Sequence, residues 1–181
     1  ATRARRPAHF HIGDRLQRDL GAVASPFNAF LLNLGLETLF LRVDRHCRNA
    51  EAVASYLASD PRISWINYPG LPDNPYYTLA RKYMPGGTCG VISFGIRGGR
   101  ETAVRFMEAL KLAAIVIHVA DARTSVLHPA STTHRQMSDA ELSACGITPD
   151  LIRLSVGIEH IDDILADIRQ ALDKVSVPCQ P

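Results

Sequence analysis

The feature that most constrains this chain is an apolar segment with an arginine at its centre. Residues 151–157 read LIRLSVG, and the alternation of side chains along a strand places the even-numbered aliphatic residues on one face. Arg153 and Ser155 then lie on the opposite face. A guanidinium within so apolar a strand is costly unless it meets an anion. Its planar fork suits a carboxylate bound through two parallel hydrogen bonds, although a structural ion pair with a buried carboxylate fits the same pattern.

Hydrophobic periodicity predicts helices and strands that alternate along the chain. Ser25-Pro26 is typical of a helix start, and the helical pattern that follows ends at Asp60-Pro61, with a bend near Gly35. Further strands are predicted over 63–65, 92–96 and 115–119, and further helices over 76–84, 100–112 and 161–172. Ser138-Asp139-Ala140-Glu141 has the spacing of a capping box, and Gly146 suits the end of the short helix that this box begins.

This order of elements predicts a two-layer α/β sandwich, in which a small, largely antiparallel or mixed sheet carries helices on one side. A hydrophobic content of 46% in 181 residues is enough for one sizeable core. We expect an irregular arm at 1–24, a long bent linking helix at 25–60 and a small α/β domain at 61–181.

Composition excludes several classes of protein. The formal net charge of +2 gives no extended basic surface for nucleic acid, and Arg3, Arg5 and Arg6 are typical of a solvated tail. The apolar runs are too short to cross a membrane. The four cysteines lack the C-x-x-C spacing of a zinc or redox site, which indicates reduced thiols in the cytosol. No metal site is predicted at His128 and His134 either, because no cysteine or carboxylate beside them completes one.

Two long motifs carry a resemblance to a known family. DARTSVLHPASTTHRQ at 121–136 and PDLIRLSVGIEH at 149–160 resemble the C-terminal domain of pyridoxal-phosphate enzymes of cysteine and methionine metabolism. Residues 25–57 resemble the helical segment that links the two domains in that family, and the similarity extends over about 18 to 175. The residues of the first motif are most similar to those of the O-acetylhomoserine sulfhydrylase branch.

The resemblance implies a fold type I enzyme that depends on pyridoxal phosphate and converts O-acetylhomoserine and sulfide to homocysteine and acetate. It also implies that Arg153 binds the substrate α-carboxylate and that Thr124 and Ser155 help to orient the substrate. A cystathionine synthase or a methionine lyase is the alternative within the family, because these enzymes share the arginine strand. Outside it, a non-catalytic amino-acid-binding or subunit-association module remains open.

The lysines bear on what this chain can do by itself. The family's chemistry needs a lysine that forms a Schiff base with the cofactor. The chain has only Lys82, Lys111 and Lys174, each on a predicted solvated helix face and none in a serine- and threonine-rich setting. We therefore expect it to be the small domain of a cytosolic, homo-oligomeric enzyme. Its partner would be the large domain of the same protein, and the isolated chain would hold no catalytic or cofactor-binding residue and would be inactive.

Overall fold

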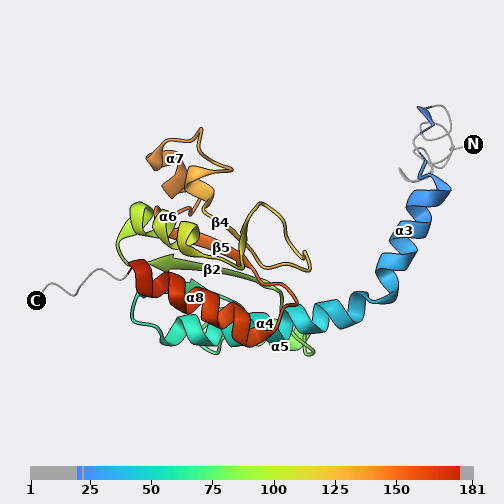
Figure 1. Cartoon of the computed structure of the whole chain (residues 1–181), viewed down its shortest axis with the longest axis horizontal. Helices are drawn as coiled ribbons and strands as arrows, with labels where there is room; N and C mark the ends of the chain where they lie inside the picture. The colour runs from blue at the N-terminus through green and yellow to red at the C-terminus, as the bar shows by residue number, and fades with distance from the viewer. Residues whose placement is uncertain (1–19, 22, 176–181) are drawn as a thin grey trace, which may run out of the picture. The chain divides into compact units, whose positions relative to one another are not determined.

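The computed structural model describes residues 20–21 and 23–175 (Figure 1), so most of the arm predicted at 1–24 lies outside it. The chain divides into two compact units, residues 1–40 and 41–181. In the first unit, α3 (Pro26–Glu37) begins as predicted, because the Asn28 N–H donates to the Ser25 side chain at 3.2 Å and Pro26 lies in the first turn. No residue of α3 is buried.

Two helices occupy the segment that was predicted as one bent helix. Thr38 separates α3 from α4 (Leu39–Ser59), and its N–H bonds to the Leu36 carbonyl instead of the carbonyl four residues earlier. The interruption therefore falls three residues after Gly35. The role of this segment as a link between two domains stays a prediction.

The sheet has five strands in the order β1-β2-β5-β4-β3. They are β1 (Ile63–Asn67), β2 (Val91–Ile96), β5 (Leu151–Ser155), β4 (Ser125–Leu127) and β3 (Ala114–Ile115). Every neighbouring pair is antiparallel except β3 with β4, so the predicted mixed, largely antiparallel sheet is confirmed. The register places Arg153 opposite Ser93 on one side and Leu127 on the other.

One prediction about this sheet is wrong. The strand expected over 115–119 is only the two residues of β3, because the chain leaves the sheet after Ile115 and runs through Ala120 with a φ of 60°. The structure also contains β4, for which no strand was predicted, and β4 pairs with β5 along its whole length.

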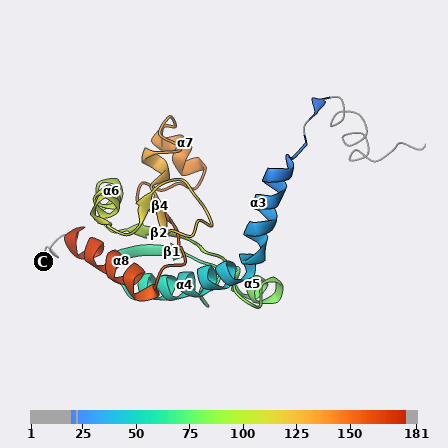
Figure 2. The ribbon, with the colours of Figure 1, turned by 45° about the vertical axis from the view of Figure 1, so that its right-hand side comes forward.

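One face of the sheet carries the core. The alternate residues Ile92, Phe94, Ile152, Leu154 and Val156 are buried there, as the period of two requires. The same cluster contains side chains from α4, α6 (Gly99–Ala109) and α8 (Ile161–Val175), and α4 and α8 lie alongside the strands in Figure 2. The two-layer arrangement is confirmed, and Arg153 lies on the face that these helices leave open. The remaining helices are α5 (Tyr77–Tyr83), the 3-10 turn η2 (Pro129–Ser131) and α7 (Asp139–Ala144), which has the predicted capping box.

Asp167 on α8 holds the segment that follows α6. Its carboxylate accepts hydrogen bonds from the backbone N–H groups of Lys111, Leu112 and Ala113 at 2.8, 2.9 and 3.1 Å. We expect Asp167→Ala to lower the free energy of unfolding by about 3 kcal/mol, because three half-buried donors lose a charged acceptor. Asp163→Ala, in the exposed first turn of α8, should cost less than about 1 kcal/mol. Urea denaturation of both variants tests the difference, and equal losses would contradict it.

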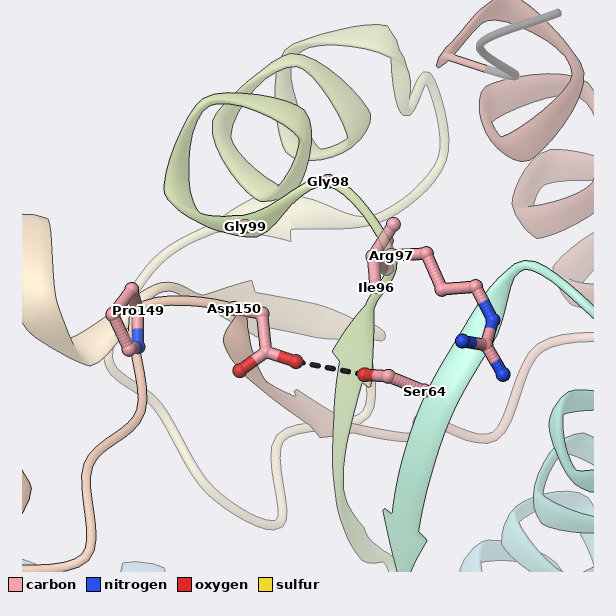
Figure 3. Close-up of a pocket in the computed structure, with 7 residues that line it drawn as sticks. All are labelled: Ser64, Ile96, Arg97, Gly98, Gly99, Pro149 and Asp150. Carbon is pink, nitrogen blue, oxygen red and sulfur yellow. Dashed lines mark hydrogen bonds between the residues drawn. The ribbon is translucent and has the colours of Figure 1, made fainter. Parts of the chain in front are cut away.

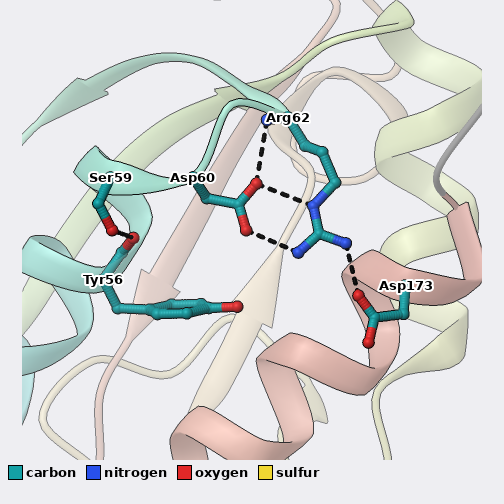
Figure 4. A network of polar contacts seen from close by, with 5 residues as sticks. All are labelled: Tyr56, Ser59, Asp60, Arg62 and Asp173. Carbon is teal, nitrogen blue, oxygen red and sulfur yellow. Dashed lines mark hydrogen bonds and ion pairs between the residues drawn. The ribbon is translucent and has the colours of Figure 1, made fainter. Parts of the chain in front are cut away.

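A charged cluster joins the end of α4 to α8 (Figure 4). Arg62 binds both carboxylate oxygens of Asp60, with Nε–Oδ1 at 2.8 Å and Nη2–Oδ2 at 2.6 Å, and its Nη1 reaches Asp173 at 2.6 Å. The hydrogen bonds from the Arg62 side chain lower the pKa of Asp60, against the opposing effect of burial. The ionised form of Asp60 is thus favoured in the folded protein.

This cluster predicts a pH dependence of stability. Because the pKa of Asp60 is lower in the folded than in the unfolded state, its contribution is complete above the unfolded pKa and is lost as the pH falls through the folded pKa. We expect the free energy of unfolding to decrease below about pH 4, and to decrease less in Asp60→Asn. Asp73→Asn removes an exposed loop carboxylate and should leave the wild-type profile unchanged. Identical pH profiles for Asp60→Asn and wild type would count against the assignment.

Candidate functional site

Arg153 is half-buried in the middle of β5, with its side chain on the open face of the sheet. Its Nη2 donates to the Ile117 carbonyl at 2.8 Å, and its Nε is buried and has no hydrogen-bond partner. Within the described part of the chain no carboxylate forms an ion pair with it. The structural ion pair that the sequence left open is therefore absent there, and the guanidinium keeps donors for an anion.

The loop at 116–124 passes over the end of β5 next to Arg153. The Ala120 N–H donates to Ser155 Oγ at 3.2 Å, and Ser125 Oγ donates to the His118 carbonyl at 3.1 Å. Asp121 receives the backbone N–H of Arg123 at 3.0 Å and lies 3.2 Å from His118 Nδ1. These two contacts lower the pKa of Asp121. The Asp121 carboxylate therefore contacts the backbone of Arg123.

Thr124 is buried, and its backbone N–H and its hydroxyl group both form hydrogen bonds within the protein. Its N–H and its hydroxyl donate to the two carboxylate oxygens of Glu159 at 2.6 and 2.8 Å, and its Oγ1 accepts the Gly157 N–H at 2.9 Å. Ser155 is also buried and accepts from Ala120. The structure thus places Thr124 and Ser155 at the end of β5, two residues beyond Arg153, and both hydroxyls are engaged by protein groups.

His128, at the start of the segment 128–134, has a structural role. His128 is completely buried, and its two ring nitrogens lie 2.8 Å from Ser131 Oγ and 2.8 Å from the Pro149 carbonyl. The loop thereby anchors the residues just before β5. In the part of the chain that the structure describes, no group of three or more potential ligands could hold a metal ion. No helix there is long and apolar enough to cross a membrane.

A cavity of about 400 Å³ opens beside the start of β5 (Figure 3). Its lining comprises Ser64, Ile96, Arg97, Gly98, Gly99, Pro149 and Asp150. Asp150 accepts hydrogen bonds from Ser64 Oγ at 2.7 Å and Trp65 Nε1 at 3.1 Å. Burial raises the pKa of Asp150, but the polar groups around the carboxylate, including the hydrogen-bonded Ser64 and Trp65, outweigh it and lower the pKa. Asp150 therefore ties the start of β5 to β1, and none of the three predicted site residues lines this cavity.

Fold and site together define a small α/β domain in which an arginine in the middle of a strand has no carboxylate partner among the described residues and is suited to bind an anion. The family model for Cys/Met metabolism PLP-dependent enzymes matches residues 7–173, and the chain belongs to this family. Both the family and its dependence on pyridoxal phosphate, predicted from the two motifs, are thereby confirmed.

Individual relatives agree with the predicted branch. A homocysteine synthase of Schizosaccharomyces pombe is 51% identical over 86% of this chain and 36% of its own length. The L-methionine gamma-lyase of Pseudomonas putida is 49% identical over 84% of this chain and 38% of its own. A crystal structure of a putative O-acetylhomoserine (thiol)-lyase from Campylobacter jejuni has a TM-score of 0.83 at 42% identity, over 91% of this chain and 39% of its own. The chain spans less than two-fifths of each of these three proteins, and its other relatives include O-acetyl-L-homoserine sulfhydrylases.

The residues of this chain do not fit the attachment of the cofactor. The Campylobacter neighbour carries N'-pyridoxyl-lysine-5'-monophosphate, which is a lysine adduct. Lys82, Lys111 and Lys174 are all exposed, and Lys82 Nζ lies over the Tyr83 ring at 5.2 Å from its centroid. None of these lysines lies in the loop or strand that holds Arg153. The loop at 116–124 and strand β5 therefore offer arginine donors suited to an anion and contain no lysine.

The sequence reasoning missed three polar residues that contact the turn after β5 or the loop beside it, namely His46, Asn49 and Glu159. His46 and Asn49 lie three residues apart on the buried face of α4, although both are polar. Glu159 belongs to the second motif and accepts both donors of Thr124. The available signal was the presence of polar residues on an apolar helical face, because buried polar groups need partners.

Proposed function

We propose that Arg153 binds the α-carboxylate of an amino-acid substrate. The observation that carries this proposal is a half-buried guanidinium that has no carboxylate partner in the described residues and whose Nε is buried without an acceptor. A bidentate carboxylate would meet this donor and a neighbouring one in the geometry that arginine favours. Thr124 and Ser155 contribute in this proposal by holding the 116–124 loop, since their hydroxyls are bonded to Glu159, Gly157 and Ala120.

The intact protein would be a pyridoxal-phosphate-dependent O-acetylhomoserine sulfhydrylase, in which this chain forms the substrate-binding small domain next to a large domain of the same protein. The names of the relatives support this reaction, and the 49% identity to a methionine gamma-lyase supports that lyase as the second candidate. The test is to supply the intact protein with O-acetylhomoserine and measure homocysteine with and without sulfide, and to measure separately whether it consumes added methionine. Sulfide-dependent homocysteine supports the sulfhydrylase, whereas consumption of methionine without sulfide supports the lyase.

We further propose a homo-oligomer in which residues 26–45 contribute to the contact. Phe27 and Phe30 of α3 are 67% and 59% exposed, a large apolar area for one helix. Sedimentation velocity of this chain at increasing concentration should show self-association, and Phe30→Glu should weaken it. Leu79→Glu on α5 changes another exposed apolar residue and should have no effect. A monodisperse monomer at high concentration would contradict the proposal.

A cytosolic location also remains a proposal. It is supported by Cys47, Cys89 and Cys145, which are free thiols in the structure.

A further inference from the structure

We propose that His46 and Asn49 of α4 are positioning residues for the substrate carboxylate, which act through the turn at 156–159 and Thr124 on the loop that orients Arg153. This inference rests on the proposed role of Arg153. It assigns a second task to α4, whose other buried side chains pack in the apolar core.

The first connection runs from α4 to the turn after β5. His46 Nδ1 donates to the Val156 carbonyl at 2.6 Å, and Asn49 Nδ2 donates to the carbonyls of Gly157 and Glu159, both at 3.0 Å. His46 is 5% and Asn49 3% exposed. Because water cannot replace these bonds at buried positions, each is costly to lose. The two side chains therefore fix three of the four carbonyls of the turn, those of Val156, Gly157 and Glu159, over a sequence separation of 108–110 residues.

The second connection runs from the turn to the loop. Glu159 receives both donors of Thr124, and the Gly157 N–H returns a bond to Thr124 Oγ1. The Ile158 N–H donates to the Ala122 carbonyl at 2.9 Å. Four hydrogen bonds thus join a turn of four residues to the end of the loop, so the loop follows any shift of the turn.

The third connection runs from the loop to the guanidinium. The Ile117 carbonyl accepts from Arg153 Nη2 at 2.8 Å, and Ala120 bonds to Ser155, the next residue but one in β5. The loop at 116–124 has no helix of its own, so its position depends on these bonds and on Thr124. A displaced Ile117 carbonyl would let the guanidinium rotate away from the orientation in which its fork meets a carboxylate. The expected consequence is weaker substrate binding with little change in the chemical step.

The experiment uses the intact protein and follows KM and kcat for O-acetylhomoserine. Asn49→Leu keeps the approximate side-chain volume and removes both hydrogen bonds, and we expect KM to rise about tenfold with kcat within about twofold. Thr124→Val should act in the same direction, and Thr124→Ser should restore KM, because it retains the hydroxyl. Should Asn49→Leu fail to fold, the pair of Thr124 variants carries the same test.

The control is Cys47→Ala, which shortens a buried side chain of the same helix that forms none of the hydrogen bonds to the turn given above. It should leave KM unchanged even if it lowers the melting temperature as much as Asn49→Leu does. A rise in KM for Cys47→Ala would show a general effect of destabilising α4 and would overturn the proposal.

A double mutant separates this inference from the function on which it rests. In an Arg153→Ala background, Asn49→Leu should raise KM no further, because residues that act through one group are not additive. Additive effects would show that Asn49 acts independently of Arg153 and would overturn the inference. If Arg153→Ala alone leaves KM unchanged, the proposed function itself fails; if only Asn49→Leu and Thr124→Val leave it unchanged, the role of Arg153 stands and the positioning role does not.

Discussion

Arg153→Ala in the intact protein is expected to raise KM for the amino-acid substrate about 30-fold or more, because the loss of a buried charged hydrogen-bonded pair costs about 2–5 kcal/mol. The absorbance of the bound cofactor should not change, since the hydrogen bond that Arg153 forms within the described residues is to the Ile117 backbone and to no lysine. Arg153→Lys should recover little of the binding. A single ammonium group cannot form two parallel hydrogen bonds to a carboxylate, and it is too compact to reach both Ile117 and a ligand.

Arg105→Ala provides the matched control for this result. Arg105 is exposed on α6, outside the loop and the strand that hold Arg153, and its removal changes the net charge by the same amount. Its KM should remain at the wild-type value. A near-normal KM for Arg153→Ala would contradict the proposal that Arg153 binds the carboxylate. An equal rise in KM for both variants would show a nonspecific effect of charge.

Local sequence patterns predicted the elements whose own residues determine them. The alternation along β5 correctly placed its aliphatic residues in the core and Arg153 on the other face. The capping box at Ser138 and Glu141 forms as predicted, and Gly146 has the expected positive φ of 74°. These features are determined by interactions between residues a few positions apart, so the local sequence is enough to predict them.

The strand predicted over 115–119 shows where such local reasoning fails. Its β-branched residues are typical of a strand, yet Ile117 is 62% exposed and the chain leaves the sheet after Ile115. The length of β3 is set by its partner, because β4 offers only Ser125 and Val126 in the pairing register. Strand propensity reflects packing on a half-buried sheet surface, and the loop here lacks that surface.

The residues of the site also differ in whether the sequence alone could predict them. Arg153 could be found from the sequence, because a charge in an apolar strand is anomalous by itself. The supporting contacts could not, since Asn49 and its carbonyl acceptors are more than 100 residues apart in the chain. The buried polar positions of α4 indicate that some partner exists, but only the fold identifies it.

Gly157 is the position at which the turn and the loop approach each other most closely. A Cβ built there would lie 2.5 Å from the Ala122 carbonyl oxygen and 2.5 Å from the Thr124 nitrogen, and would also meet the Glu159 carboxylate. Two of these three atoms belong to the backbone and cannot move by a change of rotamer. Glycine is required at this position by the closeness of the neighbouring chain, since Gly157 is not among the glycines with positive φ.

We therefore expect Gly157→Ala to lower the free energy of unfolding by about 3 kcal/mol and to raise KM for the substrate as well, because the loop must move to admit the methyl group. Gly86→Ala is the matched control, as its Cβ would meet no atom within 4 Å and its φ is not positive. Chemical denaturation and steady-state kinetics of the two variants test both effects. If Gly157→Ala lowered the free energy of unfolding while KM stayed normal, the loop would have moved without displacing the Ile117 carbonyl. The close packing of the loop on the turn would then contribute to stability alone. If neither quantity changed, the two segments would not be held as closely as the hydrogen bonds of Thr124 and Ile158 require.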